Sequence, residues 1–430
     1  MKKILALILA LAMVFALAAC GQAAAPAANE APAANEAPAA EAAPAAEEAA
    51  PAAEAAEPAA EAKTVKVGFM FLHDEQSTYD KNFMDAAKEA CEKLGVEYVL
   101  KTGVPEGQEC YETALDLVDE GCNIVFADSF GHEDYMIQAA KECPDVEFCH
   151  ATGTKAHTEG LANFHNAFAS IYEGRFLAGV AAGLKLNEMI ESGKITAEKA
   201  IMGYVGAYTY AEVISGYTSF FLGAKSVCPS VTMKVTFTGS WYDMPLEQEG
   251  AQKLIDSGCV LISQHADSMG APNVCQANGV PNVSYNGSTK EAGPDTYIVS
   301  SRINWAPYFE YIINCVANGE AIATDWTGTI ETGSVELLEL NEAVAAEGTA
   351  AKLEEVKAGL ADGSIHVFAT DAYTVGGANE TSHLADVDTD PAYTPDTEVI
   401  ADGYFHESEF RSAPYFDIQI DGIELLDTAF

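Results

Sequence analysis

Short apolar runs alternate with amphipathic helical patterns over most of the chain between residues 65 and 318. Residues 65–71 form a short run of β-branched and aromatic side chains, which predicts a buried strand. A polar loop follows at residues 73–80, and residues 81–93 then place apolar side chains on one helical face. Ligands of open α/β sheets bind beyond the carboxyl ends of the strands, so this loop is the first candidate position for a site.

The same pattern of strand, loop and helix occurs in two series, separated by a long helix predicted at residues 171–189. Alternation of this kind is typical of parallel sheets covered by helices. We therefore expect an α/β protein with two Rossmann-like lobes, each with a parallel central sheet, joined by a hinge. The other predicted elements are strands at 96–101, 123–128, 146–151, 200–208, 232–238, 260–265, 280–285 and 297–304, and helices at 108–119, 133–142, 211–226, 245–257, 271–278 and 305–318.

The lobe boundaries follow from these two series. We expect lobe 1 at residues 63–195, together with part of 305–325, and lobe 2 at residues 196–304. Residues 326–430 form a C-terminal extension that the pattern assigns to neither lobe. Within it we predict a helix at 349–360 and a strand near His366.

The N-terminal 62 residues have the composition of a targeting segment followed by a tether. Lys2 and Lys3 precede an apolar stretch that is too short to span a bilayer comfortably, so we expect a signal peptide at residues 1–19. The small residues before Cys20 resemble a bacterial lipobox, which implies cleavage before Cys20, lipidation of its thiol, and a position on the extracellular face of the cell membrane. An ordinary secretory signal with an incidental cysteine is the alternative. Residues 20–62 are rich in Ala, Pro and Glu, which predicts a solvated, disordered tether.

The charge of the chain limits its partners. The formal net charge is −43, and the tether accounts for only eight glutamates, so the part that folds is also strongly acidic. Nucleic acids and polyphosphates require many Lys and Arg contacts, which argues against them as partners. A neutral or cationic small ligand suits such a field better.

Candidate metal and catalytic motifs are weak. The nine cysteines other than Cys20 are scattered without a Cys-x-x-Cys pair, which argues against a disulfide framework or a zinc site, although one or two bridges stay possible. The histidine and carboxylate runs at 73–75 and 132–134 raise a metal hypothesis, but adjacent residues seldom point at one ion, so solvated charge is the preferred interpretation. No nucleophile elbow, zinc-protease motif or phosphate-binding glycine loop is present. We therefore expect that the protein binds no metal or cofactor and is not an enzyme.

Loops that follow the predicted strands contain aromatic side chains together with carboxylates and amides. A flat, polar heterocycle requires stacking on its faces and hydrogen bonds at its edges, and these side chains provide both. The loops are at 126–134, 208–210, 239–243, 264–268 and 285–288.

Five segments, in this order and spacing, resemble the basic membrane protein family of ABC-transporter substrate-binding lipoproteins, which have the type I periplasmic-binding-protein fold. They are FADSFG (126–131), HATG (150–153), YEGRFLAG (172–179), GSWYD (239–243) and QHADS (264–268). The resemblance extends from residue 65 to about residue 326. It implies a monomeric, membrane-tethered binding protein whose lobes close on a small heterocycle, a purine nucleoside or nucleobase, and deliver it to an ABC permease.

The resemblance also implies which residues contact the ligand. In this branch of the family the first loop usually has the sequence GWTY, and here it is QSTY at 76–79, so Ser77 lacks the aromatic ring and Tyr79 is its candidate substitute. Trp241 stands at the position of an aromatic residue on the second lobe. Asn286 stands where an aspartate often binds a ribose hydroxyl, and Asn304 stands where a lysine can occur. The full expected set is Ser77, Thr78, Tyr79, Ser129, Phe130, Tyr208, Trp241, Asp243, Asp267, Asn286, Asn304 and Trp305.

Structural roles compete with several of these assignments. Asp243 precedes Pro245 and fits a helix cap, while Asp267 fits both a cap and a ligand contact. Tyr79, Tyr208 and Trp241 also fit the core or the rim. Two other functions stay open: a receptor domain that signals through a separate membrane partner, and a hydrolase acting on a bound nucleoside.

Overall fold

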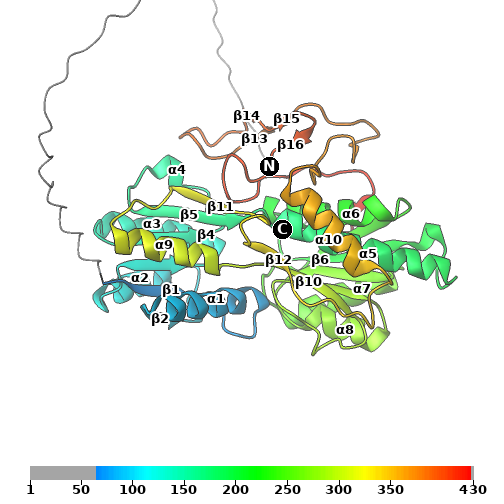
Figure 1. Ribbon diagram of the computed structural model, residues 1–430, viewed down its shortest axis with the longest axis horizontal. Coiled ribbons are helices and arrows are strands. Elements are labelled where there is room, and N and C mark those ends of the chain that lie inside the picture. The colour runs from blue at the N-terminus through cyan, green and yellow to red at the C-terminus, as the bar shows by residue number, and fades with distance from the viewer. Residues whose placement is uncertain (1–63, 428–430) are drawn as a thin grey trace, which may run out of the picture. The chain divides into compact units, whose positions relative to one another are not determined.

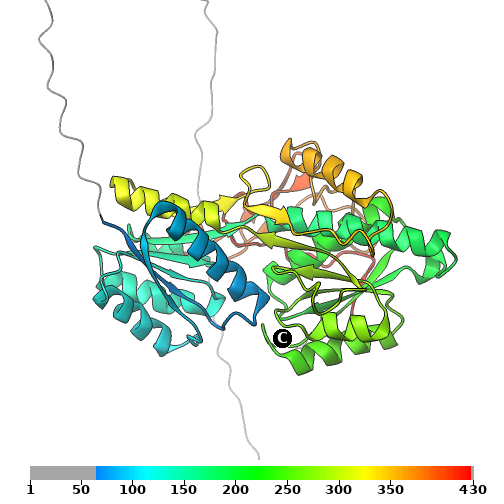
Figure 2. The same ribbon diagram turned by 60° about the horizontal axis from the view of Figure 1, so that its bottom comes forward.

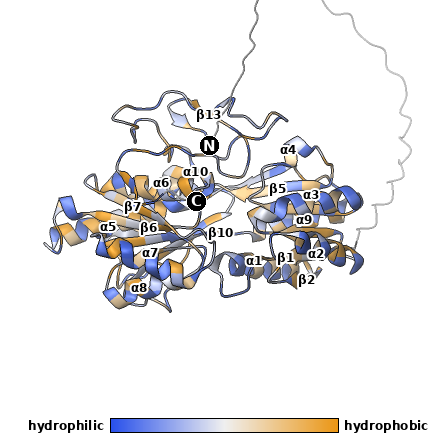
Figure 3. Ribbon diagram, turned by 180° about the vertical axis from the view of Figure 1, so that it is seen from behind, coloured by the Kyte–Doolittle hydropathy of each residue, from blue (hydrophilic) through white to orange (hydrophobic). Residues whose placement is uncertain are grey.

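The computed structural model describes residues 64–427, which belong to one compact unit of the chain. The expected signal peptide, lipidation site Cys20 and tether lie outside the described residues. Two central sheets, each covered by helices, form two lobes, which confirms the predicted α/β architecture (Figure 1, Figure 2). The strands are largely hydrophobic, whereas the surrounding helices mix polar and apolar positions (Figure 3).

The first lobe contains a six-stranded parallel sheet in the order β11-β5-β4-β3-β1-β2. Its strands are β1 (Lys66–Met70), β2 (Glu97–Lys101), β3 (Ile124–Ala127), β4 (Glu147–Ala151), β5 (Phe164–Ala169) and β11 (Asp325–Gly328). Its helices are α1 (Thr78–Leu94), α2 (Gln108–Asp119), α3 (Glu133–Glu142), the short α4 (Ala156–Glu159) and α9 (Ala306–Asn318). Helix α1 packs with α9 and α2 packs with α3, so β1 and β3 are buried on both faces. Strands buried in this way require continuous apolar runs, as the sequence has there.

The second lobe contains a seven-stranded sheet in the order β12-β10-β9-β8-β6-β7-β17. Its strands are β6 (Ile201–Gly206), β7 (Thr232–Phe237), β8 (Leu261–His265), β9 (Asn282–Tyr285), β10 (Tyr297–Ile303), β12 (Val335–Leu337) and β17 (Ile423–Leu425). Its helices are α5 (Ile171–Glu191), α6 (Ala211–Val227), α7 (Met244–Asp256), α8 (Gly270–Asn278) and α10 (Thr349–Ala361). Only β12 is antiparallel to its neighbour.

The lobe boundary expected at residue 195 placed helix α5 in the first lobe, but the structure places α5 in the second lobe. It packs against α6 and β10 of the second lobe. The approach of α5 to α6 is very close, because a Cβ atom added at Gly179 or at Gly223 would lie 2.0 Å from a backbone carbonyl oxygen of the other helix. The small residues of α5 are therefore explained by its packing on α6.

Four strands of the two main sheets were not predicted, namely β5, β11, β12 and β17. The predicted strand near His366 was wrong, because this part of the chain forms a turn and makes only an isolated bridge at Ala369. The helix predicted at 349–360 is present as α10. No helix within residues 64–427 has the length and apolarity needed to cross a bilayer.

Three chain segments cross between the lobes, after β5, after β10 and after β11, and they are hydrogen-bonded to one another. The Ser170 backbone N–H donates to the Gly328 carbonyl oxygen, and the Asn304 backbone N–H donates to the Ser334 carbonyl oxygen, each at 2.8 Å. Parallel crossings tied together in this way form a hinge, about which two packed lobes can rotate as rigid bodies.

The chain after α10 forms a C-terminal belt, residues 366–427, that contacts both lobes (Figure 1, orange to red). On the first lobe, the Tyr393 hydroxyl donates to Thr158 Oγ1 at 3.1 Å, and the Ser412 backbone N–H donates to Asp325 Oδ2 at 2.7 Å. On the second lobe, β17 pairs with β7. Short strand pairs stiffen the belt: β13 (Leu384–Ala385) with β14 (Thr397–Glu398), and β15 (Ile400–Ala401) with β16 (Tyr404–Phe405).

Candidate functional site

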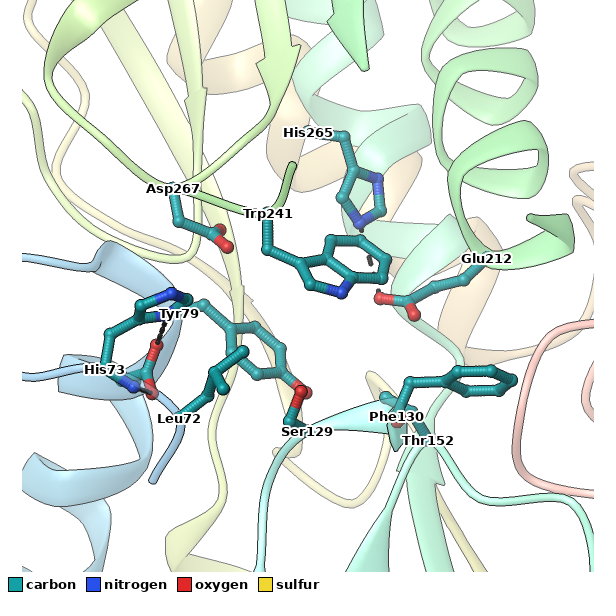
Figure 4. Close-up of a pocket in the computed structure, with 11 residues that line it drawn as sticks. Leu72, His73, Tyr79, Ser129, Phe130, Thr152, Glu212, Trp241, His265 and Asp267 are labelled. Atoms are coloured by element: carbon teal, nitrogen blue, oxygen red, sulfur yellow. Dashed lines mark hydrogen bonds and ion pairs between the residues drawn. The ribbon is translucent and has the colours of Figure 1, made fainter. Parts of the chain in front are cut away.

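A pocket lies between the lobes, beyond the carboxyl ends of strands from both sheets (Figure 4). The space between its lining atoms, including the open mouth, is about 380 Å³. The first lobe contributes Leu72, His73, Tyr79, Asp80, Ser129, Phe130 and Thr152, and the second lobe contributes Glu212, Trp241, His265 and Asp267. This is the position that the topology of open α/β sheets predicts for a ligand.

Two aromatic rings from different lobes bound the pocket. The Tyr79 hydroxyl donates to the Asp128 carbonyl oxygen at 2.8 Å, which holds the ring in place on the first lobe. The Trp241 ring on the second lobe packs edge-on against Tyr208, with 5.0 Å between ring centroids. Figure 4 shows Tyr79 and Trp241 on opposing sides of the pocket. A flat ligand between them can stack on rings whose positions are already fixed.

The carboxyl group of Asp267 points into the pocket (Figure 4). Asp267 is only 5% exposed, and no donor within residues 64–427 makes a hydrogen bond to its carboxyl group. Burial raises its pKa well above the usual value, and the charges of Asp80, Glu247 and Glu212 raise it further. An acceptor that is buried without a partner is costly unless a ligand donor satisfies it, so Asp267 is a ligand-binding candidate on geometry alone.

Asp80 lines the pocket on the first lobe, and the buried carboxyl group of Asp128 lies close enough to feel its charge. Burial alone would raise the pKa of Asp80, but hydrogen bonds from His73 and Ser77 outweigh burial and hold it below the usual value. Burial raises the pKa of Asp128 well above its usual value, and the Asp80 charge adds to this effect. The two neighbouring carboxyl groups are therefore shifted in opposite directions, so that Asp80 gives up its proton more readily than Asp128 does.

The second lobe adds Glu212 and His265. His265 Nε2 lies 3.3 Å from Glu212 Oε1, and burial lowers the pKa of His265, so its imidazole is neutral at pH 7. None of the eleven residues that line the pocket is Lys or Arg. The electrostatics of the pocket therefore disfavour anionic ligands and favour ligands that present N–H or O–H donors.

The two histidine and carboxylate runs have structural roles. His73 Nδ1 lies 3.3 Å from Asp80 Oδ2, and His132 Nε2 donates to the Val104 carbonyl oxygen at 2.9 Å. Burial lowers the pKa of His132 to about 4. Within residues 64–427, no group of three or more His, Cys, Asp or Glu side chains is arranged to bind a metal ion. All nine cysteines in this part of the chain are free, and all except Cys143 are buried.

The pocket brings together five of the residues expected from the sequence: Tyr79, Ser129, Phe130, Trp241 and Asp267. Others of the expected set adjoin it without lining it. Ser77 caps α1 by accepting a hydrogen bond from the Asp80 backbone N–H at 3.2 Å, and Asp243 caps α7 by accepting one from Leu246 at 2.9 Å. Thr78 and Tyr208 support Asp267 and Trp241, respectively.

Three expected residues lie away from the pocket lining. Trp305 is 1% exposed and stacks on Phe83 in the core of the first lobe, with 4.4 Å between ring centroids. Asn304 lies in a hinge crossing, where its side chain donates to the Gly333 carbonyl oxygen at 3.2 Å. Asn286 is buried with φ 61°, and its backbone N–H donates to the Ser301 carbonyl oxygen at 2.8 Å.

Six lining residues were not among those expected: Leu72, His73, Asp80, Thr152, Glu212 and His265. Thr152 and His265 belong to segments that carried the family resemblance. Glu212 lies in the first turn of α6, after β6. Five of the six lie in the loop or first helical turn after a strand, and His265 is the last residue of β8, so the topology was the signal that could have identified them.

The two lobes, each with a central sheet, and the pocket between them form the periplasmic-binding-protein fold. A solute-binding protein of an ABC transporter system from Aeropyrum pernix K1 has this fold: the TM-score is 0.59 with 17% sequence identity, and the match covers 71% of this chain and 93% of that one. Another, from Conexibacter woesei DSM 14684, gives a TM-score of 0.56 with 18% identity, over 70% of this chain and 98% of that one.

A family model described as "ABC transporter substrate-binding protein PnrA-like" matches residues 66–365. The chain belongs to this Bmp family. A purine-binding protein from Brucella abortus (strain 2308) is 34% identical over 250 residues, which cover 57% of this chain and 67% of that protein. A putative ABC transporter glucose-binding protein from Haloferax volcanii is 29% identical over 267 residues, which span 62% of each chain and so less than two thirds of that relative. The C-terminal belt lies outside the family model.

Proposed function

We propose that this protein captures a purine nucleoside or nucleobase between its lobes and delivers it to an ABC permease. The observation that carries the proposal is the pair of aromatic rings, Tyr79 and Trp241, on opposite sides of a pocket whose edges hold carboxyl groups. Stacking contributes about 1–3 kcal/mol for each base on an aromatic ring, and Asp267 supplies an acceptor for a ligand donor. The relative described as a purine-binding protein supports the same ligand class.

Capture depends on lobe closure. The ligand contacts Tyr79 and Ser129 on one lobe and Trp241 and Asp267 on the other, so its binding energy is realised fully only when the lobes meet. The permease then distinguishes loaded from empty protein by the closed arrangement of the lobes. A lipid on Cys20 and the tether after it keep the protein close to the permease, on the extracellular face of the membrane.

A sugar is the competing ligand, because one relative is described as a putative glucose-binding protein and aromatic rings with carboxylates also suit sugars. Two opposed rings favour a purine, since both faces of a planar base can stack.

Thermal-shift assays with adenosine, guanosine, inosine, their free bases, flavins, amino acids and glucose test the proposal. Ligand binding to the folded state alone raises its stability by RT ln(1 + [L]/Kd), so a tight ligand gives a saturable shift. We expect purine compounds to raise the Tm and glucose to leave it unchanged. A shift with glucose and none with any purine would contradict the proposed ligand class.

A further inference from the structure

Arg175 is a fully buried cation in the second lobe with no carboxylate partner. Its residue is 0% exposed, and no Asp or Glu oxygen of residues 64–427 lies within ion-pair distance of it. Its guanidinium instead donates to neutral oxygens, including Ser263 Oγ at 3.1 Å, and lies 4.9 Å from the centroid of the Tyr285 ring. A buried charge is costly without compensation, and here neutral oxygens and aromatic rings supply that compensation.

A chain of hydrogen bonds connects Arg175 to the pocket. Arg175 Nη2 lies 2.8 Å from Tyr204 Oη, Tyr204 Oη lies 3.4 Å from His265 Nδ1, and His265 Nε2 lies 3.3 Å from Glu212 Oε1. Tyr204 is fully buried, whereas His265 and Glu212 both line the pocket. The chain therefore runs from the interior of the lobe to a carboxylate that faces the ligand.

The direction of each proton in this chain is fixed by chemistry. Arginine can only donate and a carboxylate can only accept, so Tyr204 Oη accepts from Arg175 and His265 Nε2 donates to Glu212; Nδ1 of a neutral imidazole is then an acceptor, and Tyr204 Oη donates to it. The neutral imidazole then carries its proton on Nε2 and donates it to Glu212. One oxygen of Glu212 is thereby occupied on the protein side, and the other stays available as an acceptor.

We propose that Arg175, Tyr204 and His265 position Glu212 as a second specificity-determining acceptor, which binds an N–H or O–H donor of the ligand; this inference rests on the proposed function. Figure 4 shows Glu212 and Asp267 on opposite sides of Trp241. The preferred ligand therefore presents donors at two separate edges, as an aminopurine nucleoside does with its amino group and its ribose hydroxyls. Nucleotides bind more weakly, because a phosphate would meet carboxylates and no cation among the lining residues.

Calorimetry on matched ligand pairs and variants tests the inference. The pairs are adenosine with purine riboside, guanosine with inosine, and each nucleoside with its 2′-deoxy form, so that the members of each pair differ by one donor. We expect Glu212→Gln to weaken binding of the preferred ligand by about 10- to 100-fold and to reduce its discrimination within one pair, since hydrogen bonds to charged groups have that strength. Glu249→Gln, an exposed glutamate on α7, is the matched control and should bind as the wild type does.

The positioning role has its own readout. His265→Gln keeps an acceptor and a donor at this position, so its affinity should stay within about threefold of the wild type, whereas His265→Phe should bind like Glu212→Gln. Glu212→Gln with unchanged affinity and unchanged discrimination would overturn the inference. If glucose is the compound that binds, the same variants are measured with glucose. The proposed role of Glu212 can then be tested even if the proposed ligand class is wrong.

Discussion

The backbone N–H of Thr78 donates to the carbonyl oxygen of Asp267 at 2.9 Å, and the Thr78 hydroxyl lies 3.3 Å from the same oxygen. Thr78 begins α1 of the first lobe, and Asp267 follows β8 of the second lobe. The contact therefore joins the lobes at the residue whose carboxyl group faces the ligand. Lobe closure and ligand binding share this contact, so a change that opens the lobes also moves Asp267.

A substitution at Gly287 tests lobe closure, because this residue lies at the boundary between the lobes and does not line the pocket. A Cβ atom at Gly287 would lie 3.1 Å from both Cβ and Cγ2 of Thr78, across the boundary between the lobes. We expect Gly287→Val to destabilise the closed state by about 1–3 kcal/mol through overpacking and to lower the ligand affinity accordingly. The Tm of the ligand-free protein should change little. Ser288→Ala, an exposed neighbour, is the control, and equal affinities of the two variants would contradict a role for closure.

Trp241 tests stacking. Its replacement by alanine removes one of the two opposed rings, and we expect purine binding to weaken by about 1–3 kcal/mol in calorimetry. Trp326→Phe is the matched control, because Trp326 packs on Tyr308 in the first lobe and is absent from the pocket lining. An affinity of Trp241→Ala equal to that of the control would assign Trp241 a packing role.

Glu407 in the C-terminal belt predicts an unusual pH dependence of stability. Burial raises its pKa to about 8, and its Oε2 atom has no partner within residues 64–427. The unfolded carboxyl group has a pKa near 4.5, so the folded state binds this proton more tightly. The contribution of this proton to the free energy of unfolding is fully present below about pH 4.5. It is lost as the pH rises to about 8. We expect Glu407→Gln to raise the Tm at pH 8 more than at pH 5.

The exposed Glu424 provides the comparison for Glu407. Glu424→Gln should change the Tm little at either pH. If Glu407→Gln shifted the Tm equally at both values of pH, a raised pKa at Glu407 would be ruled out.

Asp427 fixes the end of the belt to the second sheet and has the opposite pH dependence. Its carboxylate accepts hydrogen bonds from Thr236 and from the Phe237 backbone N–H, and it pairs with Lys253 at 2.9 Å. Burial alone would raise its pKa, but these partners hold it below the usual value. The contribution of the ionised Asp427 carboxylate to the free energy of unfolding is present above the pKa of the unfolded state, 3.8. It is lost as the pH falls through the lower pKa of the folded state.

We expect Asp427→Asn to lower the free energy of unfolding by about 1 kcal/mol at pH 7 and to have a smaller effect at pH 3. Denaturant titrations at the two values of pH measure this difference. Asp145→Asn, at an exposed position of the first lobe, is the control. An effect of Asp427→Asn that did not depend on pH would contradict the assigned contacts.

The sequence predicted the elements that have strong periodicity and missed those that depend on distant partners. Strands such as β3 are continuous apolar runs, whereas β11 (Asp325–Gly328) is short and partly polar, and it is held by pairing with β5 more than 150 residues earlier. The belt has the same character, since β17 has only three residues and depends on β7. Local patterns contain no information on such pairings.

The sequence predicted which loops surround the pocket better than it predicted which side chains of those loops point into the pocket. Ser77 and Asp80 form an N-terminal capping pattern, with an acceptor three residues before an acidic residue, and this local role takes Ser77 out of the pocket lining. Trp305 follows a hinge crossing and packs into the core against Phe83. Glu212 is a pocket residue because β6 ends beside the cleft, and its position in the first helical turn after that strand was the signal that the sequence offered.

Mass spectrometry of the small molecule that co-purifies with the protein tests the central claim most directly. The protein is isolated without dialysis, denatured, and its released ligand identified and quantified against the protein. The account predicts a purine nucleoside or nucleobase at close to one equivalent from the wild type and much less from Trp241→Ala. A sugar or another non-purine at the same occupancy would contradict it.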